Sequence, residues 1–91
     1  IRDWQICAVV LSCDEDGMAT LSLRNKFARG DEVEIVGPDL RPFTMTVPLM
    51  EDGDGLPVEE PRNPQMEFRM QLPVQVPAFS MVRHKVDLSA K

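Results

Sequence analysis

The chain has few of the residues from which catalytic and metal sites are usually built. Its 91 residues include one histidine and two cysteines. Nucleophilic catalysis needs a Ser or Cys held against an imidazole by a third group, and a structural zinc site needs four ligands. Cysteines are more often small buried apolar side chains than nucleophiles, and one His with two Cys would need carboxylates or a second chain to complete a zinc site. We therefore expect no catalytic residue and no metal ligand set, and we do not expect this chain to be an enzyme by itself.

Long apolar runs are also absent. No stretch approaches the roughly 20 residues that cross a bilayer as a helix, and no basic-then-apolar leader stands at the start of the sequence. The first residues, Ile1 to Trp4, look like the middle of a longer sequence, which favours a domain taken from a larger enzyme. A soluble protein without a membrane partner is expected.

Positive charge is in deficit, since ten Lys and Arg stand against fifteen Asp and Glu and the net charge is −5. A large phosphate-binding surface needs a basic excess, so the composition leaves room only for a small basic patch. Cys7 and Cys13 would be about 20 Å apart along one extended strand, which is too far for a disulfide. Two free thiols and no dense cysteine framework suit a reducing cytoplasm.

Alternating apolar and polar residues are the main pattern that the sequence does contain, and they are typical of strands with one buried and one exposed face. The clearest strand is predicted at 65–72. The same period of two predicts strands at 19–24, 32–35 and 43–49. Trp4 precedes all of these segments, and we expect it to cover a barrel end or to pack against a preceding domain.

The segment 6–11 is apolar on both parities. It fits either a strand covered on both faces or one whose outer face meets another domain, and we favour the second interpretation. A last short strand is expected at 80–84. Turn residues such as Asp-Gly, Gly-Pro and Asn-Pro separate the segments, and eight prolines disfavour helices throughout.

About six short strands favour an all-β fold, a small closed or nearly closed antiparallel β-barrel, because closure removes exposed sheet edges. A two-sheet sandwich is the alternative, but a single barrel buries the apolar rows of so short a chain around one axis. No repeat or low-complexity tract divides the sequence. Residues 1–91 are therefore predicted to form a single domain.

One motif concentrates cations, an amide and an aromatic ring in segment 24–29, whose sequence is Arg-Asn-Lys-Phe-Ala-Arg. Such a group could stack on or clamp a nucleotide or a peptide. In the structural alternative, which we favour, Asn25 forms an Asx-type turn, Phe27 plugs one end of the barrel and Gly30 permits the chain to reverse. On the following strand, Glu34 is expected to be a solvated carboxylate, with a contact to another domain as the alternative.

The motif extends to residue 38 and resembles the C-terminal domain of the collagenase-like peptidases, the U32 family. In that domain an Arg-Asn-x-Phe segment is followed by Gly-Asp, a strand that carries a Glu, and a Gly-Pro turn, and all four parts stand here in this order. The turn residues are Gly30, Asp31, Gly37 and Pro38. Phe43, the turn at 52–55, Asn63-Pro64-Gln65 and Val82-Arg83 extend the resemblance over nearly the whole chain.

The resemblance implies a β-barrel similar to the second domain of translation elongation factors. It also implies a parent protein with a separate catalytic domain, described as peptidase-like, with several relatives linked to hydroxylation of bases in transfer or ribosomal RNA. An iron-sulfur cluster of the family would belong to that catalytic region, and no cofactor is expected in residues 1–91. The implied partner of this chain is the parent's catalytic domain.

The function predicted on this basis is a non-catalytic accessory domain that acts as a lid or substrate-positioning module. The alternatives are an RNA-positioning module of a tRNA or rRNA hydroxylation enzyme and a purely structural or dimerisation domain. A lid over a protein or peptide predicts a bare apolar patch around Trp4 and segment 6–11. An RNA-positioning module predicts that basic side chains, with Lys85 among them, converge on one face. The predicted contact residues are Arg24, Asn25, Lys26, Phe27, Arg29 and Arg83.

Overall fold

The computed structural model describes residues 2–63 and 65–87, and the side chains of residues 4–63 and 65–84. Within these ranges the chain consists of strands, turns and loops, and it contains no helix. Consequently no described segment could cross a membrane as a helix. The prediction of an all-β chain is confirmed.

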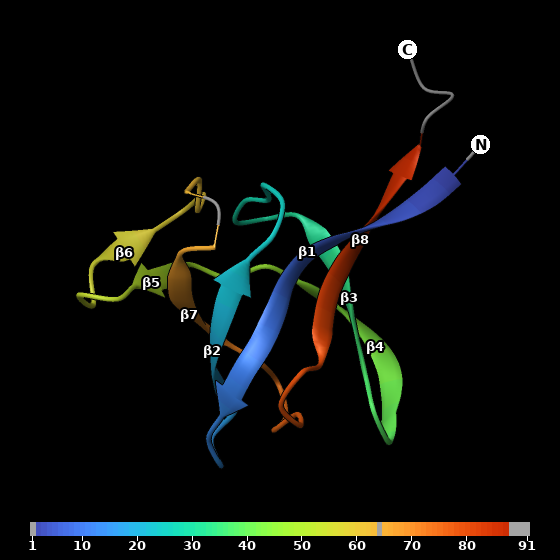
Figure 1. Cartoon of the computed structure of the whole chain (residues 1–91), viewed down its shortest axis with the longest axis horizontal. Helices are drawn as coiled ribbons and strands as arrows, with labels where there is room; N and C mark the ends of the chain where they lie inside the picture. The colour runs from blue at the N-terminus through green and yellow to red at the C-terminus, as the bar shows by residue number, and fades with distance from the viewer. Residues whose placement is uncertain (1, 64, 88–91) are drawn as a thin grey trace.

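Eight strands form one antiparallel sheet in the order β4-β3-β8-β1-β2-β7-β5-β6 (Figure 1). Their bounds are β1 Arg2–Cys13, β2 Met18–Leu23, β3 Glu32–Gly37, β4 Leu40–Thr46, β5 Met50–Asp52, β6 Pro57–Val58, β7 Glu67–Gln71 and β8 Met81–Asp87. Six of them correspond to the predicted strands. The other two, β5 and β6, are short and form a hairpin around the turn at 52–55.

The sheet has two edges, β4 and β6, and no hydrogen-bonded pairing joins them in the described part of the chain. The antiparallel fold therefore agrees with the prediction, whereas hydrogen bonds do not close the sheet into a barrel. The core is a single cluster to which all the longer strands except β4 contribute fully buried side chains. On β7 the alternation is followed closely, since Phe68 and Met70, and Leu72 just beyond the strand, are each 1% exposed.

Strand β1 departs from the predicted pattern because it contains two β-bulges. Cys7 is the extra residue in the pairing with β8, and Leu11 is the extra residue in the pairing with β2. Each bulge shifts the inward parity by one residue, so that Cys7 and Ala8 are consecutive and both fully buried. In segment 6–11 the residues Cys7, Ala8 and Val10 are fully buried, whereas Ile6 and Val9 are only partly buried and Leu11 is 38% exposed. One face of the segment thus stays partly open, which is compatible with the interpretation that we favour, and the contact of that face with another domain stays a prediction.

Two further predictions need correction. Trp4 does not precede the first strand; it lies within β1, opposite Lys85 of β8. Strand β4 ends at Thr46, and Leu49 is 44% exposed instead of buried. The strand stops there because the chain turns toward the 28–31 segment, where Val47 N donates to Asp31 O, and because Pro48 has no backbone donor.

Candidate functional site

Loop 24–31, which follows β2, is fixed to β1 by three hydrogen bonds. Arg24 N and Asn25 N both donate to Cys7 O, over 2.7 and 3.1 Å. The Asn25 side-chain amide donates to Ile6 O over 2.7 Å. Asn25 therefore clamps the loop to the neighbouring strand, and it does so through the backbone of β1 instead of an Asx-type turn on its own backbone.

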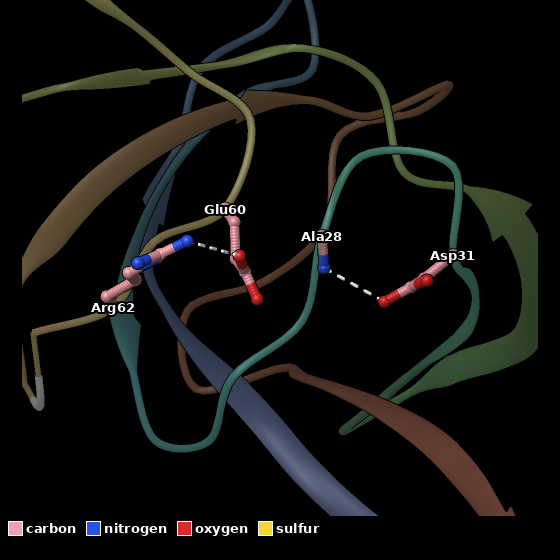
Figure 2. A network of polar contacts seen from close by, with 4 residues as sticks. All are labelled: Ala28, Asp31, Glu60 and Arg62. Atoms are coloured by element: carbon pink, nitrogen blue, oxygen red, sulfur yellow. Dashed lines mark hydrogen bonds and ion pairs between the residues drawn. The ribbon is translucent and has the colours of Figure 1, made fainter.

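The second half of the loop is closed by Asp31. Its carboxylate accepts a hydrogen bond from Ala28 N at 2.9 Å, which Figure 2 shows, and Asp31 N donates to Ala28 O at 3.0 Å. Between them Gly30 has a φ of +94°, a region that residues with a side chain rarely adopt. Arg29 N donates to Glu59 O over 2.7 Å, which ties the loop to the 59–62 segment.

Phe27 points inward from this loop. It is 3% exposed, and its ring centroid lies 5.7 Å from that of Phe68 with an interplanar angle of 54°, a favourable tilted pair. The ring belongs to the hydrophobic core and does not face solvent. A ligand in contact with the loop therefore meets its cationic side chains, not this aromatic face.

Three cations of the loop, Arg24, Lys26 and Arg29, are exposed. None of them forms an ion pair with a described residue. Among the other Lys and Arg side chains that the structure describes, Arg41 alone shares this property. Among the described side chains, unpaired positive charge is therefore concentrated in segment 24–29, although the chain as a whole is acidic.

The acidic segment beside the loop is partly neutralised. Figure 2 shows Glu60 and Arg62 next to the Ala28–Asp31 turn, and Arg62 Nη2 lies 3.1 Å from Glu60 Oε1. Exposed pairs of this kind add little stability. They nevertheless reduce the negative potential that Glu60 would otherwise place near the cations of the loop.

Arg83 lies on the other side of β1 from Asn25 and is engaged in a local cluster. Its Nε and Nη2 atoms both donate to Glu34 Oε1, the former over 2.8 Å, and its guanidinium carbon is 4.2 Å from the centroid of the Trp4 ring. The Arg83 and Glu34 side chains are only 29% and 19% exposed. Glu34 is thus a partner of Arg83, not the solvated carboxylate that we expected.

The sequence could not reveal this pair, because it depends on strand order. Strand β8 lies between β3 and β1, so that Arg83 is opposite Glu34 on one side and Ile6 on the other.

The remaining predicted turn residues lie where β3 ends: Gly37 pairs with Leu40 across the turn that contains Pro38. The predicted contact of Lys85 falls on a side chain outside the described residues.

Two shallow depressions lie on the surface. One of about 200 Å³ is lined by Trp4, Glu32, Val33, Glu34 and Thr44. The other, of about 210 Å³, is lined by Thr20, Gly53, Glu67, Phe68 and Arg69. Neither lining contains a cysteine or a histidine.

The Cys7 thiol is not activated as a nucleophile. Burial, together with the nearby Asp31 carboxylate, raises the pKa of the Cys7 thiol to about 11, so that the thiolate is scarce near neutral pH. His84 Nε2 is buried without a hydrogen-bond partner. The described residues contain no group of three or more His, Cys, Asp and Glu side chains that could hold a metal ion.

Comparisons with known proteins agree with the motif. The family model of the Peptidase family U32 C-terminal domain matches residues 2–83. Over 81 residues the chain is 36% identical to "tRNA hydroxylation protein P1" of Bacillus subtilis (strain 168), which covers 88% of this chain. The match spans 19% of that relative, so the chain accounts for about a fifth of its length.

Two solved structures have the same fold. Both are crystal structures of the C-terminal domain of a Geobacillus thermoleovorans protein assigned to the U32 peptidases, one of them a selenomethionine variant. The variant has a TM-score of 0.83 and 32% identity, and the match covers 88% of this chain and 99% of the solved one. The other has a TM-score of 0.83 and 30% identity, with 91% and 93% covered. This chain belongs to the U32 C-terminal domain family.

Proposed function

We propose that this chain is a non-catalytic domain of a longer U32-family protein that takes part in tRNA hydroxylation, and that loop 24–29 helps to position the tRNA. The observation that carries the proposal is the concentration of unpaired, exposed cations in that loop. The name of the Bacillus subtilis relative supports tRNA as the substrate. No chemistry is assigned to this domain, which acts through its contact surface.

The loop is built for contact with a phosphate backbone. Its main chain is held by hydrogen bonds to β1 and to the 59–62 segment, so the positions of Arg24, Lys26 and Arg29 are fixed at their Cα atoms. Arg and Lys that neutralise phosphates release counterions, and this release drives binding. A patch of three cations on an acidic domain gives a weak contact, which suits a domain that orients tRNA for a catalytic region elsewhere.

The other predicted contact residues have structural roles in this proposal. Asn25 clamps the loop, Phe27 fills the core and Arg83 is neutralised by Glu34. Side chains whose hydrogen-bonding groups, apolar surface or charge are already engaged within the domain have little capacity to bind a ligand. The predicted contact set is therefore reduced to the three loop cations.

A lid or docking module for a protein or peptide substrate is the second candidate. The depression beside Trp4 favours it, because an aromatic wall with Glu32 and Thr44 nearby suits a peptide side chain. The Geobacillus relatives are assigned to the peptidases, which is compatible with this function. We rank the lid second because this function does not explain the unpaired cations of loop 24–29.

The test replaces Arg24, Lys26 and Arg29 by Gln in the full-length protein. Binding of unfractionated tRNA is measured by fluorescence anisotropy over a series of salt concentrations, and hydroxylated nucleosides are measured by mass spectrometry. We expect affinity to fall at least about tenfold and the slope of log K against log salt to decrease by about 2 to 3.

A matched control removes charge away from the loop, through Arg41→Gln and Arg69→Gln, and is compared with the double loop variant Arg24→Gln and Arg29→Gln. Equal losses in the two double variants would show that only net charge matters and would contradict the role of the loop. Unchanged tRNA binding and hydroxylation in the loop variant, together with altered peptide cleavage, would favour the lid.

A further inference from the structure

Phe79 has a backbone conformation that its side chain disfavours. Its φ is +69°, in the left-handed region, where the Cβ of an L residue approaches its own carbonyl. The residue is also 73% exposed, more than any other large hydrophobic residue among those that the structure describes. An aromatic residue gains nothing for the isolated fold from this combination of strain and exposure.

The surrounding structure imposes this conformation. Phe79 N donates to Val10 O over 2.7 Å, and Val10 N donates to Ser80 O over 2.7 Å. Ser80 is fully buried, and its hydroxyl donates to Pro77 O over 2.7 Å. Because the Phe79 backbone and the following residue, Ser80, are both hydrogen-bonded to Val10 of β1, the Phe79 backbone presents the side chain outward from a fixed position. The entropy cost of binding it is correspondingly low.

Two other exposed apolar side chains accompany Phe79 at this end of the domain. Leu11, the bulge residue of β1, is 38% exposed, and Val74 is 50% exposed. The Gln75 amide donates to Cys13 O over 3.2 Å, so the loop that carries Val74 runs beside the end of β1. We call Leu11, Val74 and Phe79 the apolar tip. Within 73–79 all the exposed residues are apolar except Gln75.

The rim of the apolar tip is acidic. The exposed residues Asp14, Glu15 and Asp16 form the neighbouring turn, which is joined to the loop by hydrogen bonds from Leu72 N to Gly17 O and from the Gln71 amide to Asp16 O. Segments 11–17 and 72–80 contain no Lys, Arg or His. An acidic rim repels phosphates, so this end does not suit a nucleic acid or an anionic lipid surface.

We propose that the apolar tip docks into an apolar, basic-rimmed pocket on the remaining part of the full-length protein, with Phe79 as the anchor. The inference rests on the proposed function in one respect, because it takes the chain as one domain of a longer protein. Apolar groups surrounded by acidic ones fit an apolar pocket surrounded by basic ones. A single exposed aromatic residue that enters such a pocket often supplies much of the contact energy.

The size of the tip favours a partner in the same polypeptide. Three partly exposed side chains offer at most a few hundred Å², whereas each partner in a stable complex of separate proteins buries about 800 Å². A covalent link raises the effective concentration of the partner, so a smaller contact suffices. A second copy of this chain is disfavoured because a symmetric contact would bring the turns at 14–17 together and oppose like charges.

Docking through the tip would leave the cationic loop free. Strand β2 joins the turn at 14–17 to loop 24–31, so the two surfaces are separated by about 20 Å, the length of a six-residue strand. In Figure 1 the arrowhead of β1 marks the end with the apolar tip, and β2 points toward the opposite end. The same domain therefore has one end for attachment and the other for tRNA.

The first test places the photo-crosslinker p-benzoylphenylalanine at position 79 of the full-length protein and, as a control, at position 56. Leu56 is 60% exposed, lies in the β5–β6 turn and belongs to no part of the tip. We expect position 79 to cross-link to residues of the same polypeptide outside 1–91, and position 56 not to do so. Cross-links to a second copy, to another protein or to nothing would overturn the proposal, as would equal yields at the two positions.

The second test uses the protein without any substitution. Hydroxyl-radical footprinting compares the full-length protein with the 91-residue chain, since the related Geobacillus domain was crystallised as a domain. Oxidation of Phe79 should fall severalfold in the full-length protein, while that of Leu56 stays the same. An unchanged rate at Phe79 would refute docking. Neither readout involves tRNA, so failure of the RNA-positioning proposal would leave this result intact, and the reverse also holds.

The variant Phe79→Asn separates binding from folding. Asn tolerates the left-handed region, so the isolated domain should melt at the same or a higher temperature. In the full-length protein the same change should increase protease cleavage between this domain and the rest, because the anchor is lost. A lower melting temperature of the isolated domain would show that Phe79 serves the fold, and the proposal would fail.

Discussion

Loop 24–31 and the loop that carries Phe79 lie at opposite ends of β2 and differ in almost every side chain, yet their backbones are fixed in the same way. Each donates hydrogen bonds to β1 close to one of its two bulges: Arg24 and Asn25 to Cys7 O, and Phe79 to Val10 O. Loop 24–31 follows β2 and Phe79 precedes β8, so each set of bonds extends the ladder that β1 forms with one of its two neighbours. One irregular strand between two partners can therefore position two surfaces.

The two phenylalanines sharpen the contrast between the ends. Phe27, in the cationic loop, is 3% exposed and packs on Phe68, whereas Phe79 is 73% exposed. The first contributes to folding by leaving water, and the second keeps its apolar surface for a partner. The end that we assign to tRNA thus hides its aromatic residue, and the end that we assign to protein displays one.

The largest expected effect on stability comes from truncating Phe27, with Phe79 as its comparison. Phe27→Ala should lower the free energy of unfolding of the isolated domain by about 3 to 5 kcal/mol, because it opens a cavity beside Phe68. Phe79→Ala should change it by no more than about 0.5 kcal/mol, since an exposed side chain away from such features contributes little. Urea denaturation followed by circular dichroism measures both. Similar losses in the two variants would contradict the assignment of separate roles.

A second comparison uses the two glycines that turn the chain at the two ends. Gly17 and Gly30 have φ values of +87° and +94°, so an alanine is strained at both positions. At Gly17 an added Cβ would also lie 2.5 Å from Leu72 O, whereas at Gly30 it would meet no atom within 4 Å. We expect Gly17→Ala to cost about 2 to 4 kcal/mol and Gly30→Ala about 1 to 2 kcal/mol.

Chemical denaturation of the two glycine variants gives both values under one set of conditions. A larger loss of stability in Gly17→Ala than in Gly30→Ala would show that the turn at 14–17, beside the apolar tip, is packed more tightly than loop 24–31. If Gly30→Ala proves the more costly, loop 24–31 is the more constrained of the two, and the ranking of the ends has to be reversed.

Much of the core could be predicted from alternation, because a period of two survives wherever a strand is regular. Strand β7 is such a case, and its inward residues were identified correctly. In β1 the bulges at Cys7 and Leu11 shift the parity, and nothing in an apolar run marks where an extra residue will stand. The end of β4 was missed for a similar reason, since it depends on a hydrogen bond between Val47 and the distant Asp31.

The candidate surfaces were predictable to different degrees. The cations of segment 24–29 stand together in the sequence, so a local motif was enough to find them. Arg83 and Glu34 are brought together only by the order of three strands, which no local pattern encodes. Phe79 lay in a segment without alternation. Only one feature of the sequence points to this residue: segment 73–79 is mostly apolar although it lies outside the predicted strands. Exposed apolar residues are unusual in such a segment.

The two cysteines lie at opposite ends of the domain, Cys7 beside the cationic loop and Cys13 beside the apolar tip. Cys7 should make the stability of the domain depend on pH. The pKa of Cys7 is raised to about 11 by burial and by Asp31. A thiol with a raised pKa in the folded state favours folding while it is protonated, and the unfolded chain releases that proton first as the pH rises. Stability should therefore be constant up to about pH 9 and fall between roughly pH 9 and 11, by about 2 to 3 kcal/mol at most.

Urea denaturation at pH 8, 9, 10 and 11 measures this loss, with Cys7→Ala as the control that should remove most of the extra slope. A slope that persists in Cys7→Ala would assign the effect to other groups. A thiol reagent at pH 8 gives a simpler comparison: it should modify the half-buried Cys13 and leave the fully buried Cys7 intact until the domain unfolds.

The smallest expected effect concerns Arg83, which tests where the cationic surface ends. Arg83→Met retains most of the aliphatic stem but removes the ion pair with Glu34 and the stacking on Trp4, and it should lower stability by about 1 to 2 kcal/mol. Arg69→Met is the control, because its pair with Glu51 is more exposed, at 42% and 47%, and should contribute at most about 0.5 kcal/mol. Since the charge of Arg83 is already neutralised by Glu34, tRNA affinity of the full-length protein should be unchanged. A loss of affinity comparable to that of the loop variant would place Arg83 in the tRNA contact and extend that surface across β1.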